Sequence, residues 1–282
     1  MAGSLYVVST PIGNLDDMTV RALNTLKSVG LVAAEDTRRT GLLLRHFGIA
    51  TPTTSLHEHN ETEKLPALLR KLSGGVDIAL VSDAGTPIVC DPGQRLISAA
   101  IQQGIRVVPI PGASAVMAAL AASGYSADEF VFAGFAPSRS KDRKLWLVRV
   151  SQDPRAIVFF ETPHRITKTL ADMAEILVDR PIIIARELTK LHEEVVRTTA
   201  RLATLVQIAE RGEFTIVLAP YQVVTPQPDS VDDATLNAYF YRMTEFEGLP
   251  RRAALVSTAE KFGLSPNELY ARLERFKASG PP

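Results

Sequence analysis

Short apolar runs alternate with helical patterns through the first half of the chain. The apolar runs have the length and composition of strands and cover Leu5–Ser9, Leu31–Glu35, Pro52–Leu56, Ile78–Ser82 and Arg106–Ile110. Helical patterns lie between or after them, at Asp16–Ser28, Thr37–Phe47, Glu61–Leu72, Pro92–Gln103 and Ala113–Ala122. This alternation predicts an α/β fold with a mostly parallel sheet that helices cover on both faces.

The second half has strand patterns that are spaced less regularly, at Phe130–Phe135, Arg155–Glu161, Ile182–Glu187, Val195–Thr199 and Phe214–Ala219. The interval Glu187–Ala200 leaves no room for a covering helix, so a mixed second sheet is expected. The polar stretch Pro137–Lys144 is interpreted as a mobile basic loop.

Three further helical patterns close the chain, at Asp232–Glu245, Arg251–Phe262 and Pro266–Lys277. The segment Tyr221–Ser230, which contains Pro226 and Pro228, has the composition of a linker. The predicted organisation is therefore an α/β domain over residues 1–123, a second α/β domain over 124–222 and a small helical domain over 230–282.

Composition narrows the function classes. The chain has 282 residues, 46% of them hydrophobic, and a formal net charge of zero, so any affinity for nucleic acid must come from local patches. Its one cysteine, Cys90, excludes an internal disulfide and fits a reducing compartment. The N-terminus lacks the pattern of a signal peptide, and no apolar stretch reaches the roughly 18 residues of a membrane span.

The most informative segment runs from Val76 to Gly93, where a buried strand enters a tight turn and then a helix. Asp83 follows the strand, Gly85 allows a sharp turn, and Asp91 with Pro92 fits a helix start. Ligands of open α/β sheets bind beyond the carboxyl ends of the strands, so Asp83 is placed to bind a small polar ligand. The alternative is a structural turn in which Asp83 has no ligand.

Two other strands end in similar turns. Pro111–Ala115 opens a helix and contains Gly112 and Ser114, and Ser9–Asn14 follows the first strand. Each turn alone fits simple close packing equally well. Because parallel strands end at a common edge, the three turns together predict one composite site.

Several familiar motifs are missing. No Gly-x-Gly-x-x-Gly sequence follows the first strand, and the chain has neither a Walker motif nor His-Glu-x-x-His. His57 and His59 could suggest a metal site, but the pair lacks identifiable further ligands, and we favour a polar loop without a metal.

Six segments in order resemble the signature blocks of the ribosomal RNA small subunit methyltransferase I family, within the tetrapyrrole-methylase superfamily. They are Thr10–Leu15, Ala34–Arg38, Val81–Pro87 with Asp91–Gly93, Pro111–Ala115, Phe159–Arg165 and Arg186–Lys190. The helical tail resembles the small helix-turn-helix of the same family. The resemblance implies two α/β domains of tetrapyrrole-methylase type with S-adenosylmethionine between them, in a cytoplasmic homodimer.

The resemblance also implies the reaction, which is methylation of the ribose 2′-oxygen of a decoding-centre cytidine in 16S rRNA. The implied contacts of the methyl donor are Pro11, Asp83, Ala84, Gly85, Ile88, Ser114, Ala115 and Phe160. The usual Gly-Asp-Pro loop of the superfamily is replaced here by the longer Ser82–Pro87, so the donor contacts of this loop are open.

Catalysis and RNA binding are assigned to polar residues of the substrate-side blocks. We hypothesise that Glu161 or Glu187 orients the ribose hydroxyl, that Lys190 also acts in catalysis by gripping a phosphate, and that RNA is bound by Arg38, Arg139, Arg143 and Arg165. Trp146 is close to the basic stretch and could stack on a base. The alternative is that these charges form internal ion pairs and that Trp146 lies in the core.

Two other functions remain open at this stage. A small-molecule tetrapyrrole methylase would need a large apolar cleft, and it gives no reason for the tail. A nucleic-acid-binding regulator would use the tail as its working part, but residues 229–282 carry seven basic and eight acidic side chains, a net charge of −1.

Overall fold

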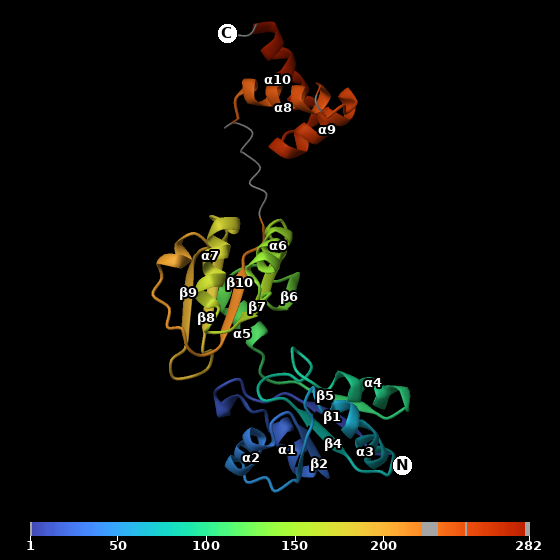
Figure 1. The fold of residues 1–282 in the computed structure, drawn as a ribbon. Helices are drawn as coiled ribbons and strands as arrows, with labels where there is room; N and C mark the ends of the chain where they lie inside the picture. The colour runs from blue at the N-terminus through green and yellow to red at the C-terminus, as the bar shows by residue number, and fades with distance from the viewer. Residues whose placement is uncertain (1, 222–230, 246, 280–282) are drawn as a thin grey trace. The chain divides into compact units, whose positions relative to one another are not determined.

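The computed structural model describes residues 2–221, 231–245 and 247–279. It divides into two compact units, one ending at Tyr221 and the other starting at Gln222 (Figure 1). Both sheets belong to the first unit. The finer division into domains at residues 123 and 124 stays a prediction, and most of the expected linker, with Pro226 and Pro228, lies outside the described residues.

The first sheet is parallel throughout, with strand order β3-β2-β4-β1-β5. Its strands are β1 (Leu5–Val8), β2 (Leu31–Ala34), β3 (Thr53–Ser55), β4 (Ile78–Val81) and β5 (Val107–Ile110). The central strand β4 is buried along its whole length. The prediction of a parallel sheet is confirmed, and each strand lies within the segment predicted for it.

Helices cover both faces of this sheet, as predicted. Ala79 and Val81 pack with the core on the side of α1 (Val20–Ser28) and α2 (Thr37–His46). Ile78 and Leu80 face α3 (Glu61–Ser73) and α4 (Gln94–Gln102). A 3-10 turn, η1, at Leu15–Asp17 precedes α1. Successive side chains of a strand point to opposite faces, which explains the unbroken apolar sequence of β4.

The start of α4 differs from the prediction. Gly93, with a φ of +117°, takes the N-cap position that was assigned to Asp91, and the helix begins two residues after Pro92. The buried Glu61 carboxylate accepts the backbone N–H groups of Arg95 at 3.0 Å and Leu96 at 3.2 Å. A side chain from α3 therefore caps α4, which leaves Asp91 free for another role.

The second sheet is mixed, as expected from the short interval before Ala200. Its strand order is β6-β7-β10-β8-β9, with one parallel pair, β6 with β7. The strands are β6 (Phe130–Phe135), β7 (Ala156–Glu161), β8 (Pro181–Arg186), β9 (Glu194–Thr199) and β10 (Phe214–Leu218).

Helix α5 (Ala115–Ser123) packs on one face of this sheet, and α6 (Ser140–Ser151) and α7 (Ile166–Leu177) cover the other. The 3-10 turn η2 (Leu202–Leu205) packs with α7. The prediction of a mobile loop at Pro137–Lys144 is wrong, because α6 begins inside it. Trp146, Leu147 and Val150 form the buried face of this helix. Trp146 is thus a core residue that packs edge-on against Phe159, and it is not available for stacking on RNA.

The second unit is a three-helix cluster of α8 (Asp233–Glu245), α9 (Arg251–Phe262) and α10 (Pro266–Ser279). Its apolar core includes Leu236, Phe240, Phe262 and Leu269. Gly263 ends α9 in the left-handed region, with a φ of +66°. In the described residues of the chain, no helix is long and apolar enough to cross a membrane.

Candidate active site

The three glycine-containing turns of the first sheet meet at its carboxyl edge. Thr10 and Gly85 exchange backbone hydrogen bonds, with N–O distances of 2.8 and 3.0 Å. The Ser9 and Thr86 hydroxyls lie 2.9 Å apart, and the Thr86 hydroxyl donates to the carbonyl of Ala113 at 3.4 Å. The predicted convergence of the turns is confirmed.

Glycine is required in two of these turns for different reasons. Gly85 has a φ of +76°, a conformation that side chains with a Cβ rarely adopt. A Cβ on Gly112 would lie 2.9 Å from the Cβ of Ser9, so the third turn could not approach the first. The glycines therefore hold the backbones close together beside an open space.

That space is a cavity of about 370 Å³, which we call the acidic cavity. Side chains from both sheets of the first unit line it. Six of the eight residues expected to contact a methyl donor are among them, namely Asp83, Ala84, Gly85, Ser114, Ala115 and Phe160. The other two differ. Pro11 lines a neighbouring cavity, and Ile88 lines neither cavity but has a strained backbone with a φ of +70°.

Three carboxylates crowd one wall of the acidic cavity, those of Glu35, Asp83 and Asp91. Burial raises the pKa of Asp91 to about 6, and the charges of Glu35 and Asp83 add to this shift. Burial also raises the pKa of Glu35. Among the residues that line this cavity, Arg39 is the only cation. This acidic wall is therefore suited to a positively charged ligand.

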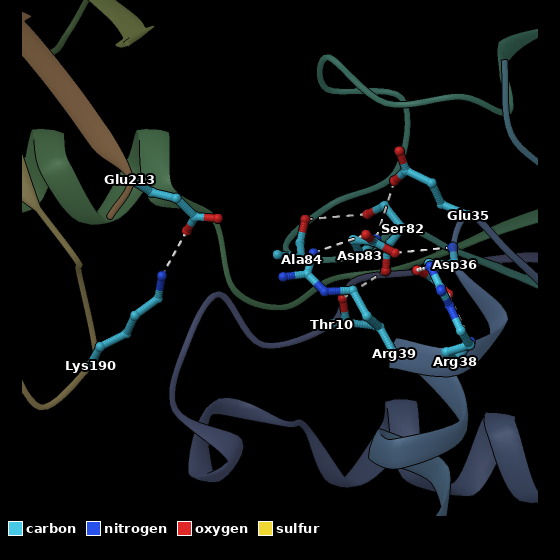
Figure 2. Close-up of polar contacts among 10 residues, drawn as sticks. All are labelled: Thr10, Glu35, Asp36, Arg38, Arg39, Ser82, Asp83, Ala84, Lys190 and Glu213. Carbon is cyan, nitrogen blue, oxygen red and sulfur yellow. Dashed lines mark hydrogen bonds and ion pairs between the residues drawn. The ribbon is translucent and has the colours of Figure 1, made fainter. Parts of the chain in front are cut away.

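Asp83 ties two strand ends of the first sheet together. One carboxylate oxygen accepts the backbone N–H of Asp36 at 3.0 Å, and the other pairs with Arg39 Nη1 at 2.9 Å (Figure 2). The backbone N–H of Asp83 in turn lies 3.4 Å from the Glu35 carboxylate. Asp83 thus has the structural role that was left open as an alternative, and it also faces the cavity.

A second space of about 410 Å³, the leucine-lined cavity, lies beside the first. Its apolar lining includes Leu15, Leu42 and Leu43, and its basic side chains are Arg39, His46 and Lys190. The two cavities share five lining residues, which are Ile12, Arg39, Asp83, Ala84 and Glu213.

Lys190 is presented by a strained turn after β8. Glu187 and Thr189 both have left-handed backbones, with φ of +53° and +69°. Lys190 Nζ lies 2.7 Å from a Glu187 oxygen and 2.9 Å from a Glu213 oxygen. Burial opposes both charges, yet the hydrogen bonds raise the pKa of Lys190 and lower that of Glu187. At neutral pH the lysine is a cation, and Glu187 is an ionised partner that holds it.

Glu161 is among the lining residues of the acidic cavity, but neighbouring groups engage its carboxylate, so we withdraw it as a group that orients the ribose. Its side chain is fully buried, and its oxygens accept hydrogen bonds from Arg165 Nε at 2.7 Å and Thr169 Oγ1 at 2.6 Å. The backbone N–H of Thr162 donates a third, at 2.7 Å. Arg165 is committed to the same pair. The ion-pair alternative therefore describes both residues better than contact with RNA does.

The four arginines assigned to RNA differ in exposure. Arg143 is only 3% exposed and pairs with the buried Asp172 at 2.6 Å, so we withdraw it as a phosphate contact. It lies on the inner face of α6 because its neighbours at helical spacing, Trp146 and Leu147, are core residues. Arg38, 88% exposed beside Asp36, and Arg139, exposed at the start of α6, remain accessible.

The sequence interpretation did not assign four charged lining residues of the acidic cavity to the site, namely Glu35, Arg39, Asp91 and Glu213. Glu35 follows β2 as Asp83 follows β4, and these strands are neighbours, so the same strand-end argument could have found it. Glu213 immediately precedes the antiparallel strand β10, whose first residue pairs with the last residues of β7 and β8. Its position depends on a strand order that the sequence does not reveal.

Comparison with known proteins identifies the family of the chain. The family model of tetrapyrrole (corrin/porphyrin) methylases matches residues 4–203. Ribosomal RNA small subunit methyltransferase I of Haemophilus influenzae is 44% identical over 275 residues, which cover 96% of each chain. The Synechocystis protein of the same name is also 44% identical, over 99% of this chain and 100% of its own. The chain belongs to this methyltransferase family.

The solved structures bear on the fold. Diphthine synthase aligns with a TM-score of 0.61 over 77% of this chain and 90% of its own, at 17% identity. The methyltransferase CobJ aligns with a TM-score of 0.59 at 18% identity, over 78% of this chain and 95% of its own. The fold of two α/β sheets is therefore that of the tetrapyrrole methylases, as the signature blocks implied.

Proposed function

We propose that the chain transfers a methyl group from S-adenosylmethionine to the ribose 2′-oxygen of a cytidine in 16S rRNA. The observation that carries this proposal is the match to ribosomal RNA small subunit methyltransferase I over almost the entire chain, helical tail included. The small-molecule alternative has weaker support, because the likeness to solved tetrapyrrole enzymes is below 20% identity and concerns the fold.

The residues of the acidic cavity fit a sulfonium donor. The donor has a net positive charge, and the wall formed by Glu35, Asp83 and Asp91 supplies the opposite charge. Phe160 makes edge contacts with Phe132 at 5.0 Å and Phe135 at 5.5 Å between ring centroids, which gives the cavity an aromatic side that suits a cation. The volume of about 370 Å³ is within the usual range of ligand pockets.

The side chains of the leucine-lined cavity would hold the ribose and its phosphate. When bound, the donor supplies a methyl group on positively charged sulfur, so the carbon–sulfur bond breaks as the carbon–oxygen bond forms and the hydroxyl proton is released. Lys190 contributes positive charge for a phosphate, and Glu187 positions Lys190. Arg38 and Arg139 supply exposed cations for neighbouring phosphates. Positioning of this kind lowers the barrier by several kcal/mol.

The proposed partners are the small ribosomal subunit and a second copy of the chain. The homodimer follows from the family resemblance, and sedimentation at micromolar concentration tests it. The cytoplasm is the proposed location because the substrate is a ribosomal particle.

The direct test of the function combines donor binding with transfer. Calorimetry should detect binding of S-adenosylmethionine, and incubation with small subunits that lack the modification should yield 2′-O-methylcytidine in the rRNA by mass spectrometry. Transfer to a tetrapyrrole but not to rRNA would establish the small-molecule enzyme instead. Binding of RNA without any binding of the donor would establish the regulator.

The raised pKa of Asp91 predicts pH-dependent donor binding. Because a cationic donor favours the ionised carboxylate, its affinity should rise between pH 5 and 7, about fivefold if bound donor lowers the pKa of Asp91 by about one unit. Asp91→Asn should flatten this pH profile in calorimetry. Asp142→Asn, on the exposed side of α6, should leave it unchanged. An equal pH response in Asp91→Asn would contradict the assignment.

A further inference from the structure

Arg39 stands where the acidic and leucine-lined cavities adjoin. It lines both of them, as does its partner Asp83. Figure 2 shows the Arg39–Asp83 pair on one side and the Lys190–Glu213 pair on the other. Arg39 extends from α2, one residue beyond the exposed Arg38. The positive charge of Arg39 therefore contributes to the electrostatic potential of both cavities.

The bond between Arg39 and Asp83 is easily exchanged. The Arg39 side chain is 64% exposed, and solvent-screened pairs of this kind contribute little to stability. Asp83 itself is held in place, because its other oxygen accepts the backbone N–H of Asp36 at 3.0 Å. Of the two partners, the arginine is therefore the one free to move.

The two cavities favour ligands of different charge. In the acidic cavity, Glu35 and Asp91 add negative charge next to Asp83, and Arg39 alone supplies a lining cation. The leucine-lined cavity shares Asp83 and Glu213 with the acidic cavity, but it adds Lys190 and His46 beside apolar side chains. This combination suits the phosphate and base of a nucleotide. A cation that enters the acidic cavity competes with Arg39 for Asp83 and repels its guanidinium group.

We propose that Arg39 is a charge latch that couples the two binding sites. Without donor it neutralises Asp83, and when a cationic donor occupies the acidic cavity it turns to a phosphate of the RNA. The inference rests on the proposed function, since it takes the acidic cavity as the donor site and the leucine-lined cavity as the RNA site. Arg39 would then link donor binding in one cavity to RNA binding in the other.

The coupling has a measurable size. A cationic donor should raise RNA affinity at least about fivefold over an uncharged analogue, the lower end of ordinary coupling between sites. By thermodynamic reciprocity, RNA should raise the affinity for the cationic donor by the same factor. An analogue without the positive charge should leave Arg39 on Asp83 and give no such gain.

The experiment compares two non-reacting ligands with the full-length protein. Sinefungin carries an amine in place of the sulfonium, whereas S-adenosylhomocysteine has an uncharged sulfur. Binding to fluorescently labelled small subunits that lack the modification is measured with either ligand at saturation. We expect at least about fivefold tighter binding with sinefungin.

Two substitutions locate the effect in Arg39. Arg39→Gln should bind the subunits more weakly and equally with both ligands. Asp83→Asn frees the arginine, so it should bind them tightly with no ligand and gain nothing from sinefungin. Arg45→Gln removes the same charge from an exposed position of α2 that lines neither cavity, and it should keep the full difference.

The possible outcomes distinguish a failure of the charge latch from a failure of the proposed function. If neither ligand binds, or the subunits do not bind, the proposed function itself fails. If both bind and rRNA is methylated, but sinefungin and S-adenosylhomocysteine give equal subunit affinity, the latch is wrong. A ligand difference that persists in Arg39→Gln also overturns it, and this variant changes an exposed side chain, so it should fold normally.

Discussion

Replacing Ala115 by phenylalanine is expected to weaken donor binding on the order of 100-fold. Ala115 begins α5 and lines the acidic cavity, so a larger side chain there takes space that the donor needs. Overfilling a packed site typically costs up to about 3 kcal/mol, and each 1.4 kcal/mol is roughly a tenfold change in affinity. Calorimetry with S-adenosylmethionine measures the loss directly.

Ala121→Phe is the matched control, because Ala121 lies exposed on the same helix and lines neither cavity. It should bind the donor as the wild type does. Thermal unfolding should show that both variants are folded. If Ala115→Phe binds the donor with unchanged affinity, the donor lies elsewhere.

Arg143→Ala is expected to destabilise the first unit by roughly 3–5 kcal/mol. The substitution leaves the Asp172 carboxylate in a largely buried site with only Ser140 and the more distant Lys144 beside it. It also removes the donors to the carbonyls of Pro137 and Ser138, each at 3.2 Å. Breaking one side of a buried ion pair typically has this cost. Denaturant unfolding measures the change.

Arg139→Ala is the control for this substitution. Arg139 is exposed at the start of the same helix and should leave stability within about 0.5 kcal/mol, while subunit binding becomes weaker and less dependent on salt. A stable Arg143→Ala variant with impaired RNA binding would restore the original interpretation of Arg143 as a phosphate contact.

Local patterns were enough to predict most elements but failed at α6. In the first half, apolar runs and helical spacing predict each strand of the parallel sheet, because neighbouring residues alone determine which faces can be buried. In α6 the first turn is Ser140-Lys-Asp-Arg-Lys144, which has the composition of a solvated loop. The charge of Arg143 is buried only because Asp172, on α7, meets it, and a partner so distant in sequence leaves no local pattern.

The candidate site shows the same division. The convergence of the turns at Thr10, Gly85 and Ala113 was predictable, since parallel strands end at one edge of a sheet. The pairings of Arg39 with Asp83 and of Lys190 with Glu213 were not. They join elements far apart in the chain, and tertiary geometry decides which of several nearby opposite charges becomes the partner.

A crystal structure of the chain with S-adenosylhomocysteine tests most directly whether the acidic cavity is the donor site. We predict the nucleoside in that cavity, in contact with Gly85, Ser114 and Ala115, with its sulfur directed toward the leucine-lined cavity. Electron density for the ligand at another place, with the acidic cavity filled only by water, would contradict the account.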